Sequence, residues 1–132
     1  MIDLDNFKAI NDSYGHSTGD AVLDEVSKVI RARVRAVDCA ARIGGDEFAI
    51  LFPNTPAELA GKVIEVLRQN IDALVLPNPK GPAIRLTCSI GVAAFNRKCR
   101  DAKSFLNIAD QALYNAKAAG RNRVIVHQAS GR

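Results

Sequence analysis

Four consecutive residues, Gly44-Gly45-Asp46-Glu47, combine backbone freedom with two carboxylates. Glycine has no Cβ atom, so the glycine pair tolerates unusual backbone angles and lets a ligand approach the main chain closely. The two carboxylates that follow are oxygen ligands of the kind that Mg²⁺ prefers. A tetrapeptide of this kind is, taken alone, more often a solvated tight turn than a functional site.

A second acidic segment, Asp3-Leu4-Asp5, follows the strand-like residues Met1 and Ile2. Carboxylates from two strand ends form an oxygen-rich site for Mg²⁺ when the fold brings them together. The two segments therefore predict a metal site on the condition that they meet in space.

The elements that must position these acids follow from the spacing of apolar residues. Residues 7–14 fit a short helix that Gly15 ends. Ser17 and Asp20 have the spacing of a capping box, which predicts that a longer helix begins there. Its buried face is expected from residues at helical intervals, namely Val22, Val26, Val29, Ile30, Val34 and Val37.

The central part of the sequence predicts a β-hairpin and then a helix. Cys39–Ile43 and Phe48–Phe52 are short apolar runs on either side of the glycine pair, which is typical of a hairpin. Thr55 is expected to start the next helix, with Pro56 at the first helical position and Glu58 completing a capping box.

The last part of the sequence predicts a loop, a strand, a helix and a strand. Residues 77–82 have the composition of a loop, and the alternation from Ile84 to Val92 is typical of a strand. A helix is expected from about Ala102 to Gly120, followed by a strand over residues 123–127. This order predicts one mixed-sheet α/β domain over residues 1–132, with helices packed on the sheet.

Composition limits the class of protein. Apolar residues make up 48% of the chain and charged residues 24%, which is typical of a folded soluble domain. The net charge is +4, but there is no Trp and the basic residues are spread along the chain, so a nucleic-acid-binding domain is a weak alternative. No apolar run is long enough to cross a bilayer, and no signal peptide is evident. Because Cys39, Cys88 and Cys99 form no CxxC pair, we expect free thiols in a cytoplasmic domain.

Five segments resemble the GGDEF family of diguanylate cyclase domains, in the order and spacing of that family. They are DLDNFKAIND (3–12), GHSTGD (15–20), RIGGDEF (42–48), TCSIGVA (87–93) and ADQALYNAKAAGRNRV (109–124). The resemblance implies a nucleotidyl-cyclase-like α/β fold, with a central mixed, largely antiparallel sheet flanked by helices and the GGDEF motif on a hairpin. It also implies an enzyme that uses Mg²⁺ or Mn²⁺ to condense two GTP molecules into cyclic di-GMP and pyrophosphate.

The resemblance implies roles for the matching acids. Asp3 and Asp46 would hold the metal ion together with the main-chain carbonyl of Leu4. Asp46 is the best candidate to assist deprotonation of the ribose 3′-hydroxyl, and Glu47 beside it belongs to the same catalytic pair. Asp5 and Glu47 would both support the site through hydrogen bonds rather than through metal contact.

Nucleotide binding is implied for a larger set of residues. The backbone N–H groups of Asn6, Phe7 and Lys8 would cradle phosphates at a helix N-terminus. Asn11 and Asp20 would hydrogen-bond the guanine edge. Lys117 and Arg121 would bind the terminal phosphates from one helix face, because they lie four residues apart. The substrate would approach the main chain at Gly44 and Gly45.

These binding residues also have structural interpretations. Asn11 could serve a helix terminus, and Asp20 could be the acid of a capping box. Lys117 and Arg121 could be favourable charges at a helix C-terminus. We favour the binding roles because the five segments match together.

Arg35 and Asp38 form an RxxD motif upstream of the hairpin. In the family, an RxxD at this position is an inhibitory site that binds the product. Arginine offers a fork of donors to guanine or phosphate, and aspartate accepts from the guanine edge. The alternative is the end of a helix, where arginine is common.

The resemblance further implies partners. One domain holds one GTP, so the reaction needs a homodimer in which two domains face each other. Family members normally begin with a helix carrying an LTGLxNR-like motif and a full first strand, whereas this sequence opens at the end of that strand. We therefore expect an N-terminally truncated domain of a longer, possibly membrane-anchored chain with an upstream sensor or receiver domain. The alternative function is a catalytically silent module that binds GTP or cyclic di-GMP, and the presence of Asp46 and Glu47 favours the enzyme.

Overall fold

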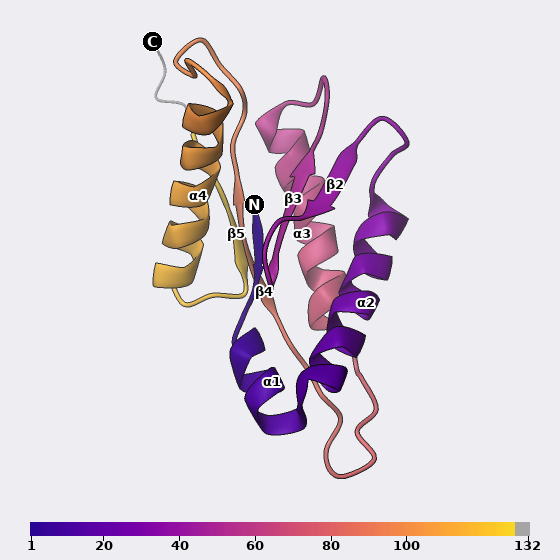
Figure 1. Cartoon of the computed structure of the whole chain (residues 1–132). Coiled ribbons are helices and arrows are strands. Elements are labelled where there is room, and N and C mark those ends of the chain that lie inside the picture. The colour runs from indigo at the N-terminus through magenta and orange to yellow at the C-terminus, as the bar shows by residue number, and fades with distance from the viewer. Residues whose placement is uncertain (129–132) are drawn as a thin grey trace.

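The structure, a computed structural model, describes residues 1–128 and has one five-stranded sheet between helices (Figure 1). The strands are β1 (Ile2–Leu4), β2 (Cys39–Arg42), β3 (Glu47–Leu51), β4 (Cys88–Val92) and β5 (Arg123–Val126). The helices are α1 (Phe7–Tyr14), α2 (His16–Arg33), α3 (Ala57–Asp72) and α4 (Ala102–Ala118). None of the described helices is long and apolar enough to cross a membrane.

The sheet has the strand order β2-β3-β1-β4-β5, which puts the short strand β1 at its centre. β1 pairs antiparallel with both β3 and β4, β2 pairs antiparallel with β3, and only β4 and β5 are parallel. The predicted mixed, largely antiparallel sheet is therefore confirmed. All three residues of β1 are buried, as expected for a strand covered on both faces.

The helices lie in two layers on opposite faces of the sheet (Figure 1). α2 and α3 cover one face, where the main core includes Val22, Val26, Leu67, Ile71 and Ile90. α4 covers the other face and approaches β4 closely at Gly91. A Cβ atom at Gly91 would lie 2.3 Å from the carbonyl oxygen of Ala109 and from the amide nitrogen of Leu113. Glycine at this position allows the α4 backbone to pack directly on the central sheet.

The predicted start and end of α2 were wrong. α2 begins at His16 after Gly15, no side chain caps it, and so Ser17 and Asp20 lie inside the helix rather than in a capping box. The helix ends at Arg33, because Val34 turns to an extended conformation with φ −87° and ψ 146°. Val37 is consequently outside the buried stripe and 65% exposed.

Two other predicted boundaries also differ, and one helix cap was not predicted. α3 begins at Ala57 with Pro56 as an uncapped N-cap, so the capping box expected from Thr55 is absent. The Thr55 hydroxyl instead donates to the carbonyl oxygen of Pro53 at 2.9 Å. β4 begins at Cys88, because Ile84 forms an isolated bridge with Leu76. α4 has a capping box that the sequence analysis did not identify, between Asp101 and Ser104.

Candidate functional site

The two acidic segments meet at the centre of the sheet. Antiparallel pairing of β1 with β3 places Asp3 opposite Glu47. The amide nitrogen of Leu4 lies 3.0 Å from the carbonyl oxygen of Asp46, to which it donates a hydrogen bond. The sheet register therefore brings together segments that are more than forty positions apart in the sequence, which meets the condition set by the sequence analysis.

Asp3 is the buried acid of this pair of segments, with 8% of its surface exposed. Burial raises the pKa of the Asp3 carboxyl, and the negative charges of Asp46 and Glu47 raise it further. A hydrogen bond from the Lys117 ammonium group acts in the opposite direction. Asp46 and Glu47 therefore add negative charge around the desolvated carboxylate of Asp3, and this combination favours a bound cation.

The donor set fits a hard divalent cation such as Mg²⁺. Mg²⁺ is usually held by one or two carboxylates and keeps several of its waters, so Asp3 and Asp46 with a main-chain carbonyl are sufficient. Within residues 1–128 there is no cluster of three or more His, Cys, Asp or Glu side chains of the kind that forms an all-protein metal cage. A site of this composition leaves coordination positions for substrate oxygens.

Asp5 has a different role from Asp3, although the two residues are neighbours in the sequence. Its carboxylate is buried and accepts hydrogen bonds from the hydroxyls of Thr87 and Ser89, each at 2.7 Å, and from the amide of Asn122 at 3.1 Å. These donors occupy its oxygens, in agreement with a supporting role. Thr87, Ser89 and Asn122 were not identified as site residues from the sequence. The two-residue spacing of Thr87 and Ser89, which puts both on one side of an extended segment, was the available signal.

The N-terminus of α1 lies directly after this acidic segment. Asn6 is the N-cap in a left-handed conformation with φ 56°, and no side chain caps the helix. The first amides of a helix have no intrahelical acceptor, so Asn6, Phe7 and Lys8 present N–H groups suited to an anion. The Phe7 side chain anchors the turn in the core, whereas Lys8 is exposed.

The packing of α1 on α2 brings Asn11 close to the residue that precedes Asp20. A Cβ atom at Gly19 would lie 1.8 Å from the Oδ1 atom of Asn11. The Asn11 side chain thus occupies the space that a side chain at position 19 would need. The exposed Asp20 follows Gly19 on α2. The structure places these two predicted base-binding residues at one helix contact.

The prediction that Lys117 and Arg121 share a helix face was wrong. α4 ends at Ala118, and Arg121 lies in the following turn with a left-handed backbone. Lys117 bonds to the Asp3 carboxylate. Within residues 1–128 the Arg121 guanidinium forms no hydrogen bond or ion pair, and the residue is exposed.

The turn of the β2–β3 hairpin does not use the positive φ angles that glycine permits. The positive-φ glycines of the described chain are Gly15 and Gly120, so neither Gly44 nor Gly45 uses this freedom. A Cβ atom at Gly45 would meet no atom within 4 Å. Gly45 therefore leaves open space at the turn, whereas a Cβ atom at Gly44 would lie 3.0 Å from the Glu47 carboxylate. The guanidinium Nε of Arg42 donates to the Gly44 carbonyl oxygen at 3.0 Å.

Arg35 and Asp38 lie together in the loop between α2 and β2. The guanidinium donates to both carboxylate oxygens of Asp38, with the shortest N···O distance 2.8 Å, and also to the Thr55 hydroxyl at 2.9 Å. The Arg35 hydrogen bond lowers the pKa of the Asp38 carboxyl. The two residues predicted to bind product therefore bind each other in this structure.

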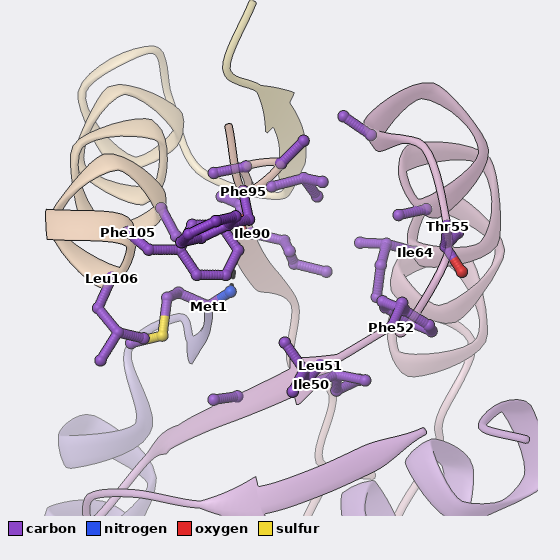
Figure 2. A pocket seen from close by; sticks show the side chains of 18 of the residues that line it. Met1, Ile50, Leu51, Phe52, Thr55, Ile64, Ile90, Phe95, Phe105 and Leu106 are labelled. Atoms are coloured by element: carbon purple, nitrogen blue, oxygen red, sulfur yellow. Dashed lines mark hydrogen bonds between the residues drawn. The ribbon is translucent and has the colours of Figure 1, made fainter. Parts of the chain in front are cut away.

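One pocket of the described chain, drawn in Figure 2, is lined by none of these acids. It measures about 530 Å³ and is mainly apolar, with Met1, Ile50, Phe52, Phe95 and Phe105 among the residues around it. None of the predicted metal or nucleotide ligands lines it.

The sequence of this chain is similar to those of known proteins. The family described as "Diguanylate cyclase, GGDEF domain" matches residues 1–123. This chain belongs to the GGDEF family. Diguanylate cyclase A of Treponema denticola is 47% identical over 124 residues, which cover 94% of this chain and 33% of that protein.

Solved GGDEF structures share the fold. The GGDEF domain of DgcB from Caulobacter crescentus, in complex with c-di-GMP, has a TM-score of 0.89 at 35% identity and covers 95% of this chain and 74% of its own. The active GGEEF domain of a diguanylate cyclase from Vibrio cholerae has a TM-score of 0.88 at 34% identity, with 98% and 81% covered. The chain thus spans most of a GGDEF domain but about a third of the length of its full-length relative.

Proposed function

We propose that this GGDEF domain is the catalytic part of a diguanylate cyclase, which joins two GTP molecules into cyclic di-GMP and releases pyrophosphate. The observation that carries the proposal is the meeting of Asp3 with the hairpin acids at the centre of the sheet. The diguanylate cyclases among its relatives and the match over residues 1–123 support the same reaction.

The reaction requires a metal ion, a bound triphosphate and a base. Asp3, Asp46 and the Leu4 carbonyl would hold Mg²⁺ or Mn²⁺, which when bound neutralises charge on the phosphate oxygens. The amides at the start of α1 would hold phosphates, and Asp46 would accept the proton of the attacking 3′-hydroxyl. Glu47 adds a second carboxylate next to that base.

Selection of GTP would come from Asn11 and Asp20 at the contact of α1 with α2. A carboxylate accepts from the guanine N1–H and N2–H₂ groups, whereas adenine offers no such pair of donors on that edge. Lys117 would move from Asp3 to the terminal phosphates when a metal ion binds, because the metal then supplies the positive charge beside Asp3.

The test is product formation from GTP and Mg²⁺ by the longer natural chain, resolved by chromatography. We expect cyclic di-GMP from the unmodified protein and none from Asp46→Ala. Asp24→Ala is the matched control, since Asp24 is an exposed acid on α2 that pairs with Lys28. Binding of GTP without turnover in the unmodified protein would favour the silent receptor instead, and full activity in Asp46→Ala would reject the assigned base.

We also propose that Arg35 and Asp38 form an inhibitory product site. Arg35 and Asp38 already lie together. Cyclic di-GMP would bind when contacts to its guanine base or to one of its phosphates replace the ion pair between these two residues. We expect micromolar product binding by calorimetry, lost in Arg35→Ala and retained in Arg31→Ala, which changes an exposed arginine of α2. Unchanged product binding in Arg35→Ala would refute this site.

A further inference from the structure

The turn between α4 and β5 has an unusual backbone. Gly120, Arg121 and Asn122 have φ angles of 118°, 63° and 48°, so three successive residues lie in the left-handed region. A residue with a Cβ atom rarely adopts this conformation, because the Cβ atom comes too close to the following carbonyl oxygen. Two such residues in sequence are stable only if neighbouring groups hold the turn in place.

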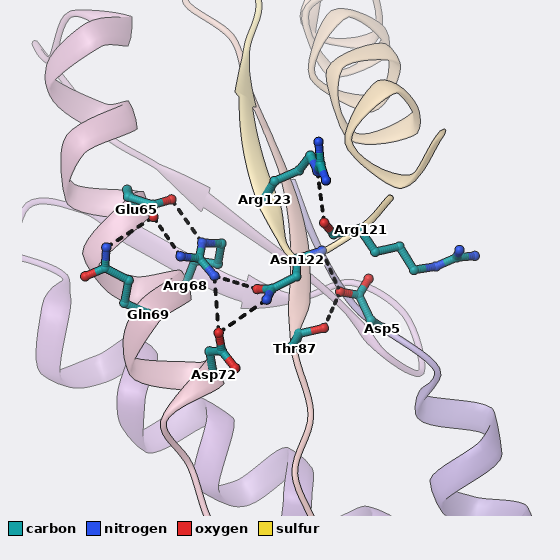
Figure 3. Close-up of polar contacts among 9 residues, drawn as sticks. All are labelled: Asp5, Glu65, Arg68, Gln69, Asp72, Thr87, Arg121, Asn122 and Arg123. Atoms are coloured by element: carbon teal, nitrogen blue, oxygen red, sulfur yellow. Dashed lines mark hydrogen bonds and ion pairs between the residues drawn. The ribbon is translucent and has the colours of Figure 1, made fainter. Parts of the chain in front are cut away.

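Asn122 provides those contacts through both its backbone and its side chain (Figure 3). Its amide donates to the Asp5 carboxylate at 3.1 Å. Its side-chain oxygen accepts from the Arg68 guanidinium, and its side-chain nitrogen donates to Asp72 at 3.2 Å. One residue thus joins the turn to α3 and to the end of β1.

The anchor on α3 is itself well held. The Arg68 side chain is 13% exposed and donates two hydrogen bonds to the Glu65 carboxylate, at 3.0 and 2.7 Å. The same guanidinium lies 3.5 Å from Asp72. Arg68 is therefore held by two carboxylates of its own helix while it donates to the Asn122 side-chain oxygen.

The turn fixes the backbone of Arg121 but leaves its guanidinium open. The Arg121 amide donates to the carbonyl oxygen of Ala116 at 3.0 Å, and the Arg121 carbonyl oxygen accepts from Arg123 at 3.0 Å. Figure 3 shows the Arg121 side chain extending away from Asn122 and Asp5. A fixed backbone with an exposed guanidinium that pairs with no group among residues 1–128 is suited to binding an anion.

We infer that Asn122 is a positioning residue that sets Arg121 for the phosphates of a nucleoside triphosphate. This inference rests on the proposed function, in which Arg121 binds the terminal phosphates. Asp5 extends the connection, because its carboxylate binds the Asn122 amide while its own backbone continues from Asp3. Asn122 and Asp5 thereby connect the proposed metal-binding segment at Asp3 to Arg121, the proposed phosphate-binding residue.

The experiment is a double-mutant cycle of Asn122→Gly and Arg121→Ala. Glycine retains the left-handed backbone and removes only the amide side chain. The ligand is 3′-deoxy-GTP with Mg²⁺, which lacks the attacking hydroxyl and can be titrated by calorimetry without turnover. Asn54→Gly is the matched control, since Asn54 is also left-handed with φ 52° and lies in an exposed loop.

We expect Asn122→Gly to weaken binding about fivefold in the unmodified protein and to have almost no effect in Arg121→Ala, the non-additivity of a coupled pair. Asn54→Gly should bind like the unmodified protein. Equal weakening in both backgrounds, or no effect of either substitution, would overturn the inference and leave the proposed function in place. Absence of binding by the unmodified protein would instead reject the proposed function and the inference with it.

A second variant, Asn122→Asp, replaces Asn122→Gly in the cycle if the glycine variant does not fold. Asn122→Asp keeps an acceptor for Arg68 but places a carboxylate where the amide donated to Asp72. The same cycle with this variant is expected to show weaker coupling to Arg121→Ala in the same direction. Full additivity would again overturn the positioning role.

Discussion

Asp3 and Asp5 are buried carboxylates two residues apart that have different surroundings. Asp5 accepts three hydrogen bonds, at 2.7, 2.7 and 3.1 Å. Asp3 is buried near Asp46 and Glu47, and burial is the main cause of its raised pKa. Asp5 is therefore a structural acid, whereas Asp3 retains a charge that the fold alone does not fully stabilise.

Replacement of Asp3 by asparagine should raise thermal stability in the absence of divalent metal. The folded-state pKa of Asp3 is raised, so its ionisation destabilises the fold as pH rises from about 3.9 through the folded-state value. At neutral pH and in EDTA we expect Asp3→Asn to melt roughly 2–4 °C higher than the unmodified protein. The gain should disappear near pH 3, where the carboxyl is protonated in both states.

Asp5→Ala is the contrasting control, because it leaves the half-buried Thr87 hydroxyl and the buried Ser89 hydroxyl without their acceptor and should lower the melting temperature. Mg²⁺ should raise the melting temperature of the unmodified protein and have little effect on Asp3→Asn. A melting temperature of Asp3→Asn below that of the unmodified protein at every pH would contradict the assignment of Asp3 as a destabilised charge.

At the scale of elements, the contact of α4 with β4 determines whether Lys117 can reach Asp3. The α4 backbone lies on Gly91, and Lys117 extends from the last turn of the same helix. A displacement of α4 away from the sheet would move Lys117 away from the acids. Gly91 therefore links the packing of the sheet to the electrostatics of the site.

Gly91→Ala tests this contact. The added Cβ atom would lie 2.3 Å from backbone atoms of Ala109 and Leu113, which cannot rotate away as a flexible side chain can. We expect a loss of about 2–3 kcal/mol in the free energy of unfolding, measured by urea denaturation. Gly45→Ala is the control and should leave stability unchanged, because nothing lies within 4 Å of its Cβ position. Equal stability of the two variants would show that α4 can shift without cost.

At the scale of the whole molecule, the candidate site lies where β1 meets β3 at the centre of the sheet. The proposed reaction consumes two GTP molecules, and the proposed site of one domain would hold one of them. In this proposal each 3′-hydroxyl attacks a phosphate held by another copy of the domain, so association of two domains is part of catalysis.

The specific activity should consequently rise with protein concentration and reach a plateau when dimers predominate. The measurement is the initial rate of pyrophosphate release over a hundredfold dilution series at saturating GTP. We expect the rate to depend on the square of the concentration at high dilution, because two domains must meet. A constant specific activity over the whole series would contradict the two-domain reaction.

Local patterns in the sequence determined much of this protein. The apolar spacing predicted the helices around Val26, Ile64 and Leu113, and the glycine pair predicted the β2–β3 hairpin, because periodicity reflects which face of an element is buried. The acids of both segments were evident from residue type. Helix ends were less predictable: Ser17 and Thr55 are acceptable caps by type, but neighbouring contacts placed the chain otherwise.

Tertiary structure alone decided which of these residues act together. The opposition of Asp3 and Glu47 depends on sheet register, and the bond of Lys117 to Asp3 joins residues at opposite ends of the sequence. The network of Asn122 likewise joins α3, β1 and the α4–β5 turn. Such contacts depend on how elements pack and not on the order of residues within any one element, so no local spacing in this sequence records them.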